Sequence, residues 1–215
     1  MLTLFGDLES GNVHKVQLLL RRLNVPYRRV DVSQRRGDTR RPELLALNPI
    51  GKVPILLLDD GDVLSESGAI LYLLGCRSEL WPAGERARAE VLRWMFFEQY
   101  SHEPALAVLR YLKRFAGDPA AHAHRFHDLA ARAGRALQAM EIRLGAGPWI
   151  AGDRPTLADY ALYPYTCWAG EADVDLQPYP AVRRWLAAFE ALPAFLPLRT
   201  DGAVSAIGFD AFLAT

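Results

Sequence analysis

Cysteine is scarce in this sequence and net charge is absent, and each of these absences excludes classes of protein. The 215 residues contain only two cysteines, Cys76 and Cys167, which lie far apart and form neither a CxxC pair nor a metal-ligand spacing. We therefore expect a reducing compartment. The 25 basic residues balance the 25 acidic ones, so no overall field attracts the chain to nucleic acid or to an anionic membrane.

The sequence also lacks a long apolar run. No stretch approaches the roughly 20 apolar residues of a membrane-spanning helix, and the opening MLTLFGDLES has no basic region before an apolar core, as a signal peptide would. We therefore expect a cytoplasmic protein with no membrane partner. His122, His124 and His127 lack an established ligand spacing with Cys or Glu, so they predict a solvated helix face and no metal site.

Two regions of different character follow each other along the chain. The first alternates strand signals with helical periodicity, and the second, after Trp81 and Pro82, has helical periodicity alone. We expect an α/β domain over residues 1–76, a linker over 77–84 and an all-α domain over 85–215, whose apolar tail docks on the protein. In the first domain the expected strands are residues 2–5, 27–32, 53–58 and 63–64, and the expected helices are 13–23, 42–47 and 67–74.

Two features of the sequence point to function. One is a proline at the start of an apolar strand, and the other is a Glu-Ser pair at the start of a helix. Pro54 has no backbone N–H to give a sheet, so it belongs at a strand start or an edge. Glu66 and Ser67 lie where a helix begins, and helix N-termini bind anionic groups. Together they predict a site that holds a small peptide by its backbone and its carboxylates.

Four segments carry a resemblance to the soluble glutathione transferases, and together they span nearly the whole chain. They are NPIGKVPILLLDDGDVLSESGAILYLL, DLESGNVHKVQLLL, FFEQYSHEP and IAGDRPTLADYALYPY. The Glu-Ser pair at a fixed distance from a Val-Pro, after NPxGK, is the most specific feature. The resemblance implies a thioredoxin-like βαβαββα domain followed by an all-helical domain, as in bacterial members with a serine or asparagine active-site turn (theta-like or nu-like).

The resemblance implies that the peptide is glutathione, bound as a co-substrate. In the family the proline that matches Pro54 follows a cis bond, which turns the Val53 backbone toward the cysteinyl backbone of glutathione. Glu66 would accept from the γ-glutamyl ammonium, and Ser67 would donate to the γ-glutamyl carboxylate. The alternative for Glu66 and Ser67 is simple helix capping, since both are ordinary first-turn residues.

We expect a cationic side chain to bind the glycyl carboxylate of glutathione. Lys52 directly precedes the Val-Pro pair and is one candidate. Arg40 is the other, chosen by position among the arginines of residues 35–41. The alternative for these arginines is a solvated loop.

Glutathione must attack as a thiolate, and the resemblance implies that a donor in the turn before the first helix stabilises it. A free thiol has a pKa of about 8.5, and each unit of lowering takes about 1.4 kcal/mol of preferential stabilisation. Ser10 matches the catalytic serine of theta-class enzymes, and Asn12 matches an asparagine of nu-class enzymes, which reduce disulfides with glutathione. We take Ser10 as the principal donor and Asn12 as the second; both also cap helices well. The turn has no Cys and no Tyr, which argues against the cysteine and tyrosine classes.

The helical region offers a folding motif and a set of pocket candidates. Thr156 and Asp159 form a capping box, which predicts a role in folding rather than in chemistry. In the family the electrophile pocket lies beside the first helix of this domain, so Tyr100, His102 and Tyr111 are candidates to line it. The alternative for each of the three is a purely structural position.

The function that these features predict is a homodimeric cytoplasmic glutathione S-transferase, which conjugates the glutathione thiolate to a small electrophile in detoxification. One alternative within the fold is a glutathione-dependent disulfide or peroxide reductase, favoured if Asn12 faces the sulfur. A second is a non-enzymatic regulatory or scaffold protein, and a third is a lyase or isomerase that uses glutathione as a cofactor.

Overall fold

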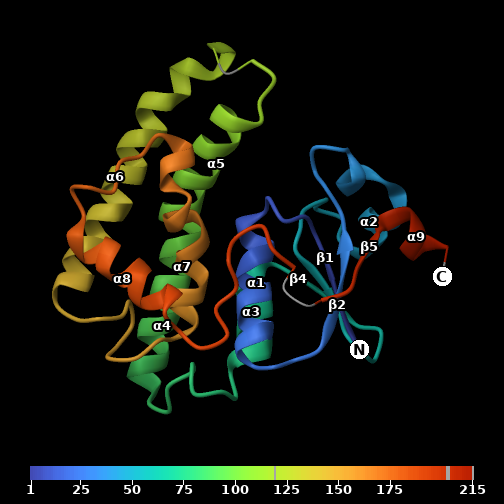
Figure 1. Ribbon diagram of the computed structural model, residues 1–215, viewed down its shortest axis with the longest axis horizontal. Helices are drawn as coiled ribbons and strands as arrows, with labels where there is room; N and C mark the ends of the chain where they lie inside the picture. Colours follow the sequence, from blue (N-terminus) through green and yellow to red (C-terminus); the bar gives the residue numbers. More distant parts are fainter. Residues whose placement is uncertain (119, 202–203, 215) are drawn as a thin grey trace. The chain divides into compact units, whose positions relative to one another are not determined.

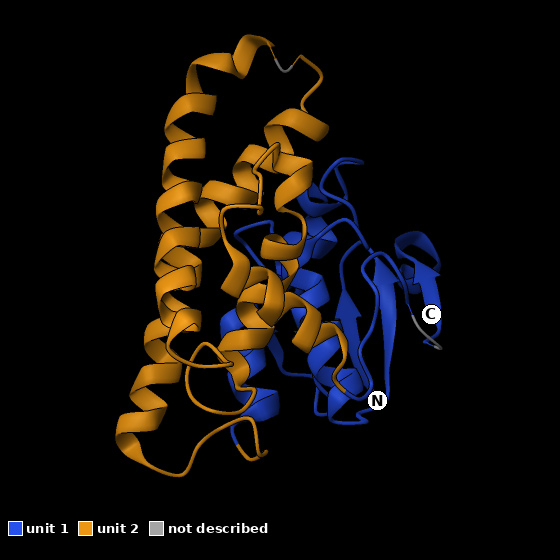
Figure 2. Cartoon of the chain, turned by 60° about the vertical axis from the view of Figure 1, so that its left-hand side comes forward, with its two compact units in different colours: residues 1–76, 193–215 blue, residues 77–192 orange. Residues whose placement is uncertain are grey.

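The chain folds into two compact units. A computed structural model describes residues 1–118, 120–201 and 204–214. Unit 1 contains Met1–Cys76 and Pro193–Thr215, and unit 2 contains Arg77–Leu192. Figure 2 shows unit 1 in blue and unit 2 in orange. The two ends of the chain therefore belong to the same unit.

Unit 1 is built, within the described residues, on a five-stranded sheet in the order β4-β3-β1-β2-β5. β1 runs parallel to β2 and antiparallel to β3, and β3 pairs antiparallel with β4. The predicted βαβαββα order is confirmed. The elements are β1 (Leu2–Phe5), α1 (Gly11–Arg22), β2 (Tyr27–Asp31), a 3-10 turn (Asp38–Arg40), α2 (Pro42–Leu47), β3 (Ile55–Leu57), β4 (Val63–Ser65) and α3 (Ser67–Gly75).

Helices cover both faces of this sheet because successive residues of a strand point to opposite sides. Leu4 packs in one buried cluster with Val13 of α1 and Ile70 of α3. Its neighbour Phe5 packs in another cluster with Leu44 of α2. As Figure 1 shows, α1 and α3 therefore lie together on one face of the sheet and α2 lies on the other.

The end of the chain differs from its prediction. The sequence predicts an all-α domain over residues 85–215, but Pro193–Thr215 folds with unit 1. Its β5 (Ala206–Gly208) pairs parallel with β2, and α9 (Phe209–Leu213) follows it. The physical reason is the free edge of β2, whose backbone N–H and C=O groups a further strand satisfies. A strand of three residues is too short for an alternation of apolar and polar residues to predict it. Residues 119, 202, 203 and 215 of the predicted domain lie outside the described residues.

The tail does dock through its apolar residues, as predicted. Phe209 is buried beside Phe5 and Leu44. The Phe212 ring meets the Phe5 ring edge-on, with 5.1 Å between the ring centroids. These contacts extend the apolar layer on the α2 face of the sheet, so the tail is part of the core of unit 1.

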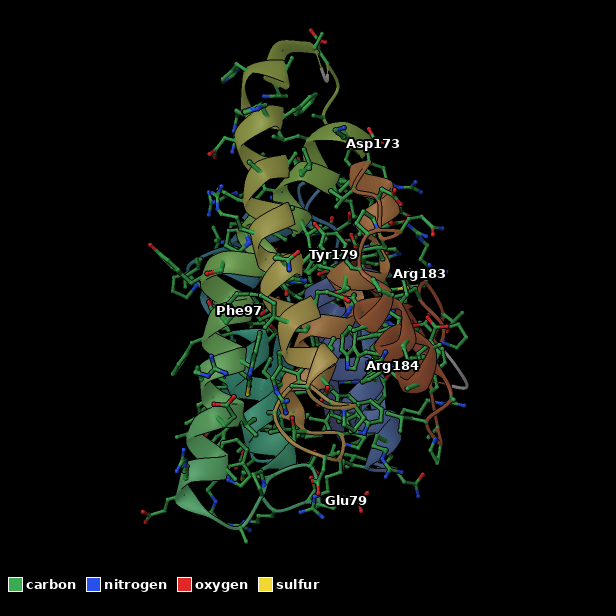
Figure 3. The ribbon with its side chains drawn as sticks, turned by 90° about the vertical axis from the view of Figure 1, so that its left-hand side faces the viewer. Glu79, Phe97, Asp173, Tyr179, Arg183 and Arg184 are labelled. Atoms are coloured by element: carbon green, nitrogen blue, oxygen red, sulfur yellow. The ribbon has the colours of Figure 1, made fainter. Side chains whose placement is uncertain are left out.

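Unit 2 is helical, as predicted. Side chains join α8 (Pro180–Glu190) to α6 (Ala123–Gly145). The Glu141 carboxylate accepts hydrogen bonds from the N–H groups of Ala181 (3.0 Å) and Val182 (2.9 Å). Arg184, labelled in Figure 3, donates to the Leu144 carbonyl at 2.8 Å. Within the described residues no helix is long and apolar enough to span a membrane. The helices are α4 (Glu85–Phe97), a π-helical turn (Glu98–His102), α5 (Glu103–Arg114), α6 (Ala123–Gly145), α7 (Leu157–Cys167) and α8 (Pro180–Glu190), with 3-10 turns at Ala120–His122 and Ala169–Ala172.

The predicted capping box begins α7. The Thr156 N–H donates to the Asp159 carboxylate at 2.8 Å, and the Thr156 side chain accepts from the N–H of Asp159. The carboxylate also accepts from two groups outside α7, the N–H of Ile150 (3.0 Å) and the indole N–H of Trp185 (2.9 Å). Asp159 therefore links α7 to the preceding loop and to α8, which agrees with a role in folding.

One titratable group on α1 makes stability depend on pH. His14 is buried, and burial lowers its pKa from 6.5 to about 4. Between these values the unfolded chain binds a proton that the native state does not, so the free energy of unfolding falls as the pH falls through this window. At pH 5 the loss from His14 amounts to about 2 kcal/mol.

We therefore expect the wild-type protein to lose about 2 kcal/mol more than His14→Gln between pH 7 and pH 5, by urea unfolding. His124→Gln, which changes an exposed histidine, is the matched control and should follow the wild type. Equal pH dependence in wild type and His14→Gln would refute the prediction.

Candidate functional site

The pairing of the strands gathers most of the predicted site residues at one edge of the sheet in unit 1. Phe5, the last residue of β1, pairs with Val30 near the end of β2 and with Ile55 at the start of β3. Ile55 also pairs with Ser65, the last residue of β4. The turn after β1, the loop after β2, the segment before β3 and the residues after β4 therefore share this edge.

The turn after β1 carries Ser10 into the start of α1. Gly6 opens the turn with φ +151°, and a Cβ there would lie 2.2 Å from a methyl group of Val13, so only glycine fits. Ser10 caps α1, and its Oγ accepts a hydrogen bond from the Val13 N–H at 3.3 Å. Because the oxygen accepts, the hydroxyl hydrogen can donate to another group at the positive end of the helix.

Asn12, the second predicted donor, lies in the first turn of α1. Its Oδ1 accepts from the buried ammonium of Lys15 at 2.7 Å. Because lysine is only a donor, this contact fixes the oxygen of the amide toward Lys15 and turns its NH2 group, a donor, the other way. Ser10 and Asn12 therefore both present donors near the N-terminus of α1.

The two predicted cations come from neighbouring loops of the same edge. Arg40 ends the 3-10 turn after β2, and its Nη1 would lie 3.3 Å from a Cβ built on Gly51. Lys52 follows Gly51, and its carbonyl accepts from the Asn48 side chain at 2.9 Å. Both side chains are exposed. The structure therefore brings Arg40 to the loop that carries Lys52.

The Val-Pro and Glu-Ser pairs flank the β3–β4 hairpin. The Val53–Pro54 bond is cis. Glu66 has φ +68°, a left-handed conformation that non-glycine residues rarely adopt and that is typical of functional positions. Ser67, the first residue of α3, is buried. Since Ile55 pairs with Ser65, the two dipeptides lie at the same end of the hairpin.

The three predicted pocket residues belong to unit 2, and the structure separates them by burial. His102 is fully buried, and its Nε2 lies 2.8 Å from the Thr166 hydroxyl. It thus occupies a position in the core of unit 2, which differs from the predicted lining of a substrate pocket. Tyr100 is 82% exposed and Tyr111 is half exposed. Helical spacing alone does not distinguish the buried face from the exposed one in this segment.

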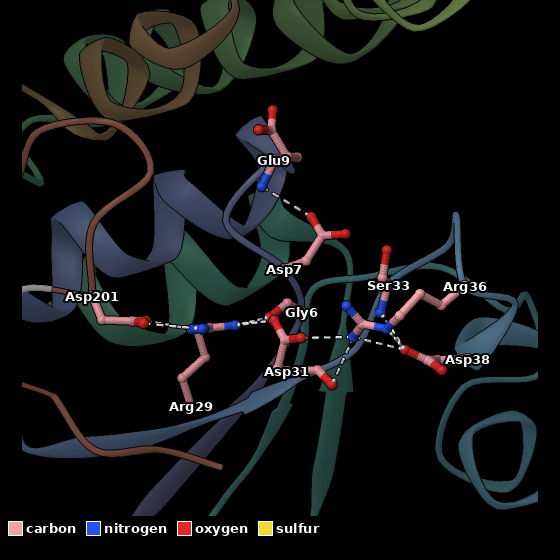
Figure 4. A network of polar contacts seen from close by, with 9 residues as sticks. All are labelled: Gly6, Asp7, Glu9, Arg29, Asp31, Ser33, Arg36, Asp38 and Asp201. Atoms are coloured by element: carbon pink, nitrogen blue, oxygen red, sulfur yellow. Dashed lines mark hydrogen bonds and ion pairs between the residues drawn. The ribbon is translucent and has the colours of Figure 1, made fainter. Parts of the chain in front are cut away.

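A network of charged groups near Ser10 was not predicted from the sequence. Arg29 on β2 contacts Gly6, Asp31 and Asp201 (Figure 4). Asp31 in turn accepts from Arg36 at 2.6 Å. The doubled arginine in the strand YRRVD is a signal for such a network, because one of two adjacent strand residues must face a covered side of the sheet.

The chain belongs to the glutathione S-transferase family. Residues 9–75 match the glutathione S-transferase N-terminal domain and residues 105–193 match the C-terminal domain. The disulfide-bond oxidoreductase YfcG of Escherichia coli is 31% identical over 193 residues, which cover 86% of this chain and 88% of YfcG. A glutathione S-transferase structure from Pseudomonas fluorescens has a TM-score of 0.90 and 40% identity, and covers 93% of this chain and 99% of its own.

A further structural neighbour was solved with its ligand. It is a glutathione transferase from Burkholderia graminis with two glutathione molecules bound per subunit. It is 32% identical with a TM-score of 0.81, and the match covers 90% of this chain and 85% of its own. Within the described residues of the present chain, no group of three or more His, Cys, Asp or Glu side chains is arranged to hold a metal ion.

Proposed function

We propose that this protein binds reduced glutathione at the sheet edge of unit 1 and transfers its thiolate to a small electrophile. The observation that carries the proposal is the convergence on one edge of a helix-capping hydroxyl, two exposed cations and the Val-Pro and Glu-Ser pairs. This set of groups complements a tripeptide with two carboxylates, one ammonium and one thiol.

Each part of glutathione has a partner in this proposal. The Val53 backbone pairs with the cysteinyl backbone, as in strand addition. Glu66 accepts from the γ-glutamyl ammonium, and Ser67 donates to the γ-glutamyl carboxylate at the N-terminus of α3. Arg40 and Lys52 bind the glycyl carboxylate.

The chemistry follows from the donors around the sulfur. The Ser10 hydroxyl donates a hydrogen bond to the thiolate, which lowers the thiol pKa, so that the thiol proton passes to solvent without a formal base. The thiolate then attacks the electrophilic carbon to form a C–S bond, and the leaving group departs with the electron pair of the broken bond. Asn12 is the second donor to the same sulfur.

The Lys52 assignment predicts a selective loss of affinity. Lys52→Met should raise the glutathione Kd about fivefold, because an exposed charge contact contributes about 1 kcal/mol. The affinity for γ-glutamylcysteine, which lacks the glycyl carboxylate, should stay unchanged. Calorimetric titration measures both, and Arg21→Met, at the far end of α1, is the matched control. A parallel loss for both ligands would exclude Lys52 from the glycyl contact.

Glutathione-dependent disulfide reduction is the second candidate function. Two comparisons favour it: the similarity to the oxidoreductase YfcG, and the neighbour with two bound glutathione molecules. In this reaction one glutathione thiolate attacks a disulfide sulfur and releases a thiolate, and a second glutathione attacks the mixed disulfide to give glutathione disulfide. Cys167 is an unsuitable relay, because burial raises the pKa of its thiol.

A paired assay separates the two functions. The purified protein is given glutathione with a chloronitroaromatic compound in one reaction and with a small dialkyl disulfide in the other, and kcat/KM is compared. Faster conjugation supports the transferase. Faster formation of glutathione disulfide supports the reductase. Binding of glutathione without either activity supports the regulatory protein or the lyase or isomerase.

We further propose that the protein is a cytoplasmic homodimer that serves in detoxification. The family membership supports this proposal, since soluble members of this family commonly pair. Sedimentation of the purified chain at micromolar concentration tests the dimer, and a monomer under those conditions would contradict it.

A further inference from the structure

The guanidinium of Arg29 is buried and held by groups from three parts of unit 1. The side chain is 4% exposed. Its Nη1 donates to the Gly6 carbonyl and to the Asp31 carboxylate, both at 2.7 Å. Its Nε and Nη2 both donate to the Asp201 carboxylate, the second at 3.0 Å. Figure 4 shows Arg29 between Asp201 on one side and Gly6 and Asp31 on the other. The planar fork of donors fixes the relative positions of these acceptors.

The Gly6 carbonyl that Arg29 holds begins the turn that carries Ser10. Three residues separate Gly6 from Ser10. Within the turn, the Asp7 carboxylate accepts from the Glu9 N–H at 3.0 Å, and the Asp7 carbonyl accepts from the Ser10 N–H at 3.3 Å. Because these short-range bonds make the turn one rigid piece, holding its first carbonyl also holds Ser10.

The C-terminal segment contacts the same region at two further points. Arg199 donates from Nε to the Glu9 carboxylate at 2.9 Å, one residue before Ser10. Arg199 has φ +61°, a conformation that persists in a non-glycine residue only where surrounding contacts hold it. The His14 ring on α1 forms a hydrogen bond with the backbone of Leu196. Residues 196–201 therefore meet the turn, the strand beneath it and the first helix.

We infer that this C-terminal segment positions Ser10 for the glutathione thiolate, and that Arg29 and Arg199 are the positioning residues that carry its effect. The inference rests on the proposed function, since it concerns the thiolate of bound glutathione. The hydroxyl of Ser10 stabilises a thiolate only within hydrogen-bond reach, and a displacement of about 1 Å at a reacting centre is enough to cost about a hundredfold in rate. Asp201 is thus distant in sequence yet acts on the chemistry through Arg29.

The test replaces both contacts without changing net charge. The variant Asp201→Asn, Arg199→Gln removes one negative and one positive charge, so long-range electrostatic effects largely cancel. Asp210→Asn is the matched control, because it breaks another ion pair of the same tail, with Arg41, away from the turn. The readouts are the thiol pKa of bound glutathione, from thiolate absorbance near 240 nm against pH, and the Kd of S-methylglutathione, which has no thiol to ionise.

We expect the double variant to raise the bound thiol pKa by about half a unit or more, which corresponds to a fall of about threefold in the ratio of thiolate to thiol at a given pH. The Kd of S-methylglutathione should change by less than about twofold, because binding groups outside the turn are intact. The control should match the wild type in both. The inference would be overturned if the wild type lowers the thiol pKa below that of free glutathione and the double variant lowers it by the same amount.

Two further results keep the test decisive. If the double variant does not fold, Asp201→Asn alone is measured, and it should shift the thiol pKa in the same direction; no shift would overturn the inference. If wild-type protein binds no glutathione, or leaves its thiol pKa unlowered, the proposed function has failed, and the role of the segment fails with it. The failure of the positioning role alone is therefore distinguishable from the failure of the site.

Discussion

Replacement of Asp159 by alanine should lower the free energy of unfolding by about 4 kcal/mol, a large part of the 5–15 kcal/mol that stabilises a typical domain. The side chain is fully buried. Its carboxylate accepts hydrogen bonds from the Thr156 N–H and hydroxyl, the Ile150 N–H and the Trp185 indole at 2.8 to 3.0 Å. Alanine leaves these donors buried without an acceptor, and each such group costs about 1–3 kcal/mol.

Chemical denaturation followed by tryptophan fluorescence measures this loss. Asp153→Ala is the matched control, because it removes an exposed carboxylate from the loop just before α7, and it should change stability by less than about 0.5 kcal/mol. Asp159→Asn should lie between the two, since an amide retains one acceptor oxygen. A loss below about 1 kcal/mol for Asp159→Ala would mean that the capping box contributes little to folding.

The second large effect concerns Ser10. Ser10→Ala should reduce kcat about a hundredfold, because loss of the hydroxyl donor raises the pKa of the bound thiol and leaves less of the reactive thiolate. It should also lower stability by about 1 kcal/mol through the lost cap of α1. Ser10→Gly is the matched control for this second effect: glycine caps nearly as well as serine but has no donor. The two variants should therefore show the same reduction in kcat, and Ser10→Gly should be more stable than Ser10→Ala.

The measurement compares kcat at saturating glutathione with unfolding by urea. Asn12→Ala, made in parallel, tests the second donor and should reduce kcat by about tenfold or less. The opposite order, with Asn12→Ala much more damaged than Ser10→Ala, would assign the thiolate to Asn12. That result would also favour disulfide reduction over conjugation.

The fold was predictable wherever the signal was local. The apolar spacing of α1, the turn after β3 and the capping box of α7 all depend on residues within one or two helical turns of each other, and each is found in the structure. β5 was not predictable, because three residues give no periodicity. Its pairing with β2 depends on a free strand edge that only the folded sheet provides.

The candidate site shows the same difference between residues that a local motif connects and residues that only the fold brings together. Val53, Pro54, Glu66 and Ser67 were identified because one motif places them at fixed spacing, and the register of β3 and β4 then brings them to one edge. Arg29 and Asp201 are 172 positions apart, so no spacing rule connects them. His102 lies in a segment that the sequence identifies, but the segment alone does not reveal whether the His102 ring faces the core or solvent.

The claim that unit 1 binds glutathione is tested most directly by calorimetric titration of the purified protein with reduced glutathione, beside the variant Glu66→Ala, Ser67→Ala. We predict binding by the wild type and a loss of affinity of about a hundredfold or more in the variant, since two charge-assisted contacts to the γ-glutamyl group are removed. Equal binding by the two would show that glutathione sits elsewhere, and a folded wild type that binds none would contradict the account.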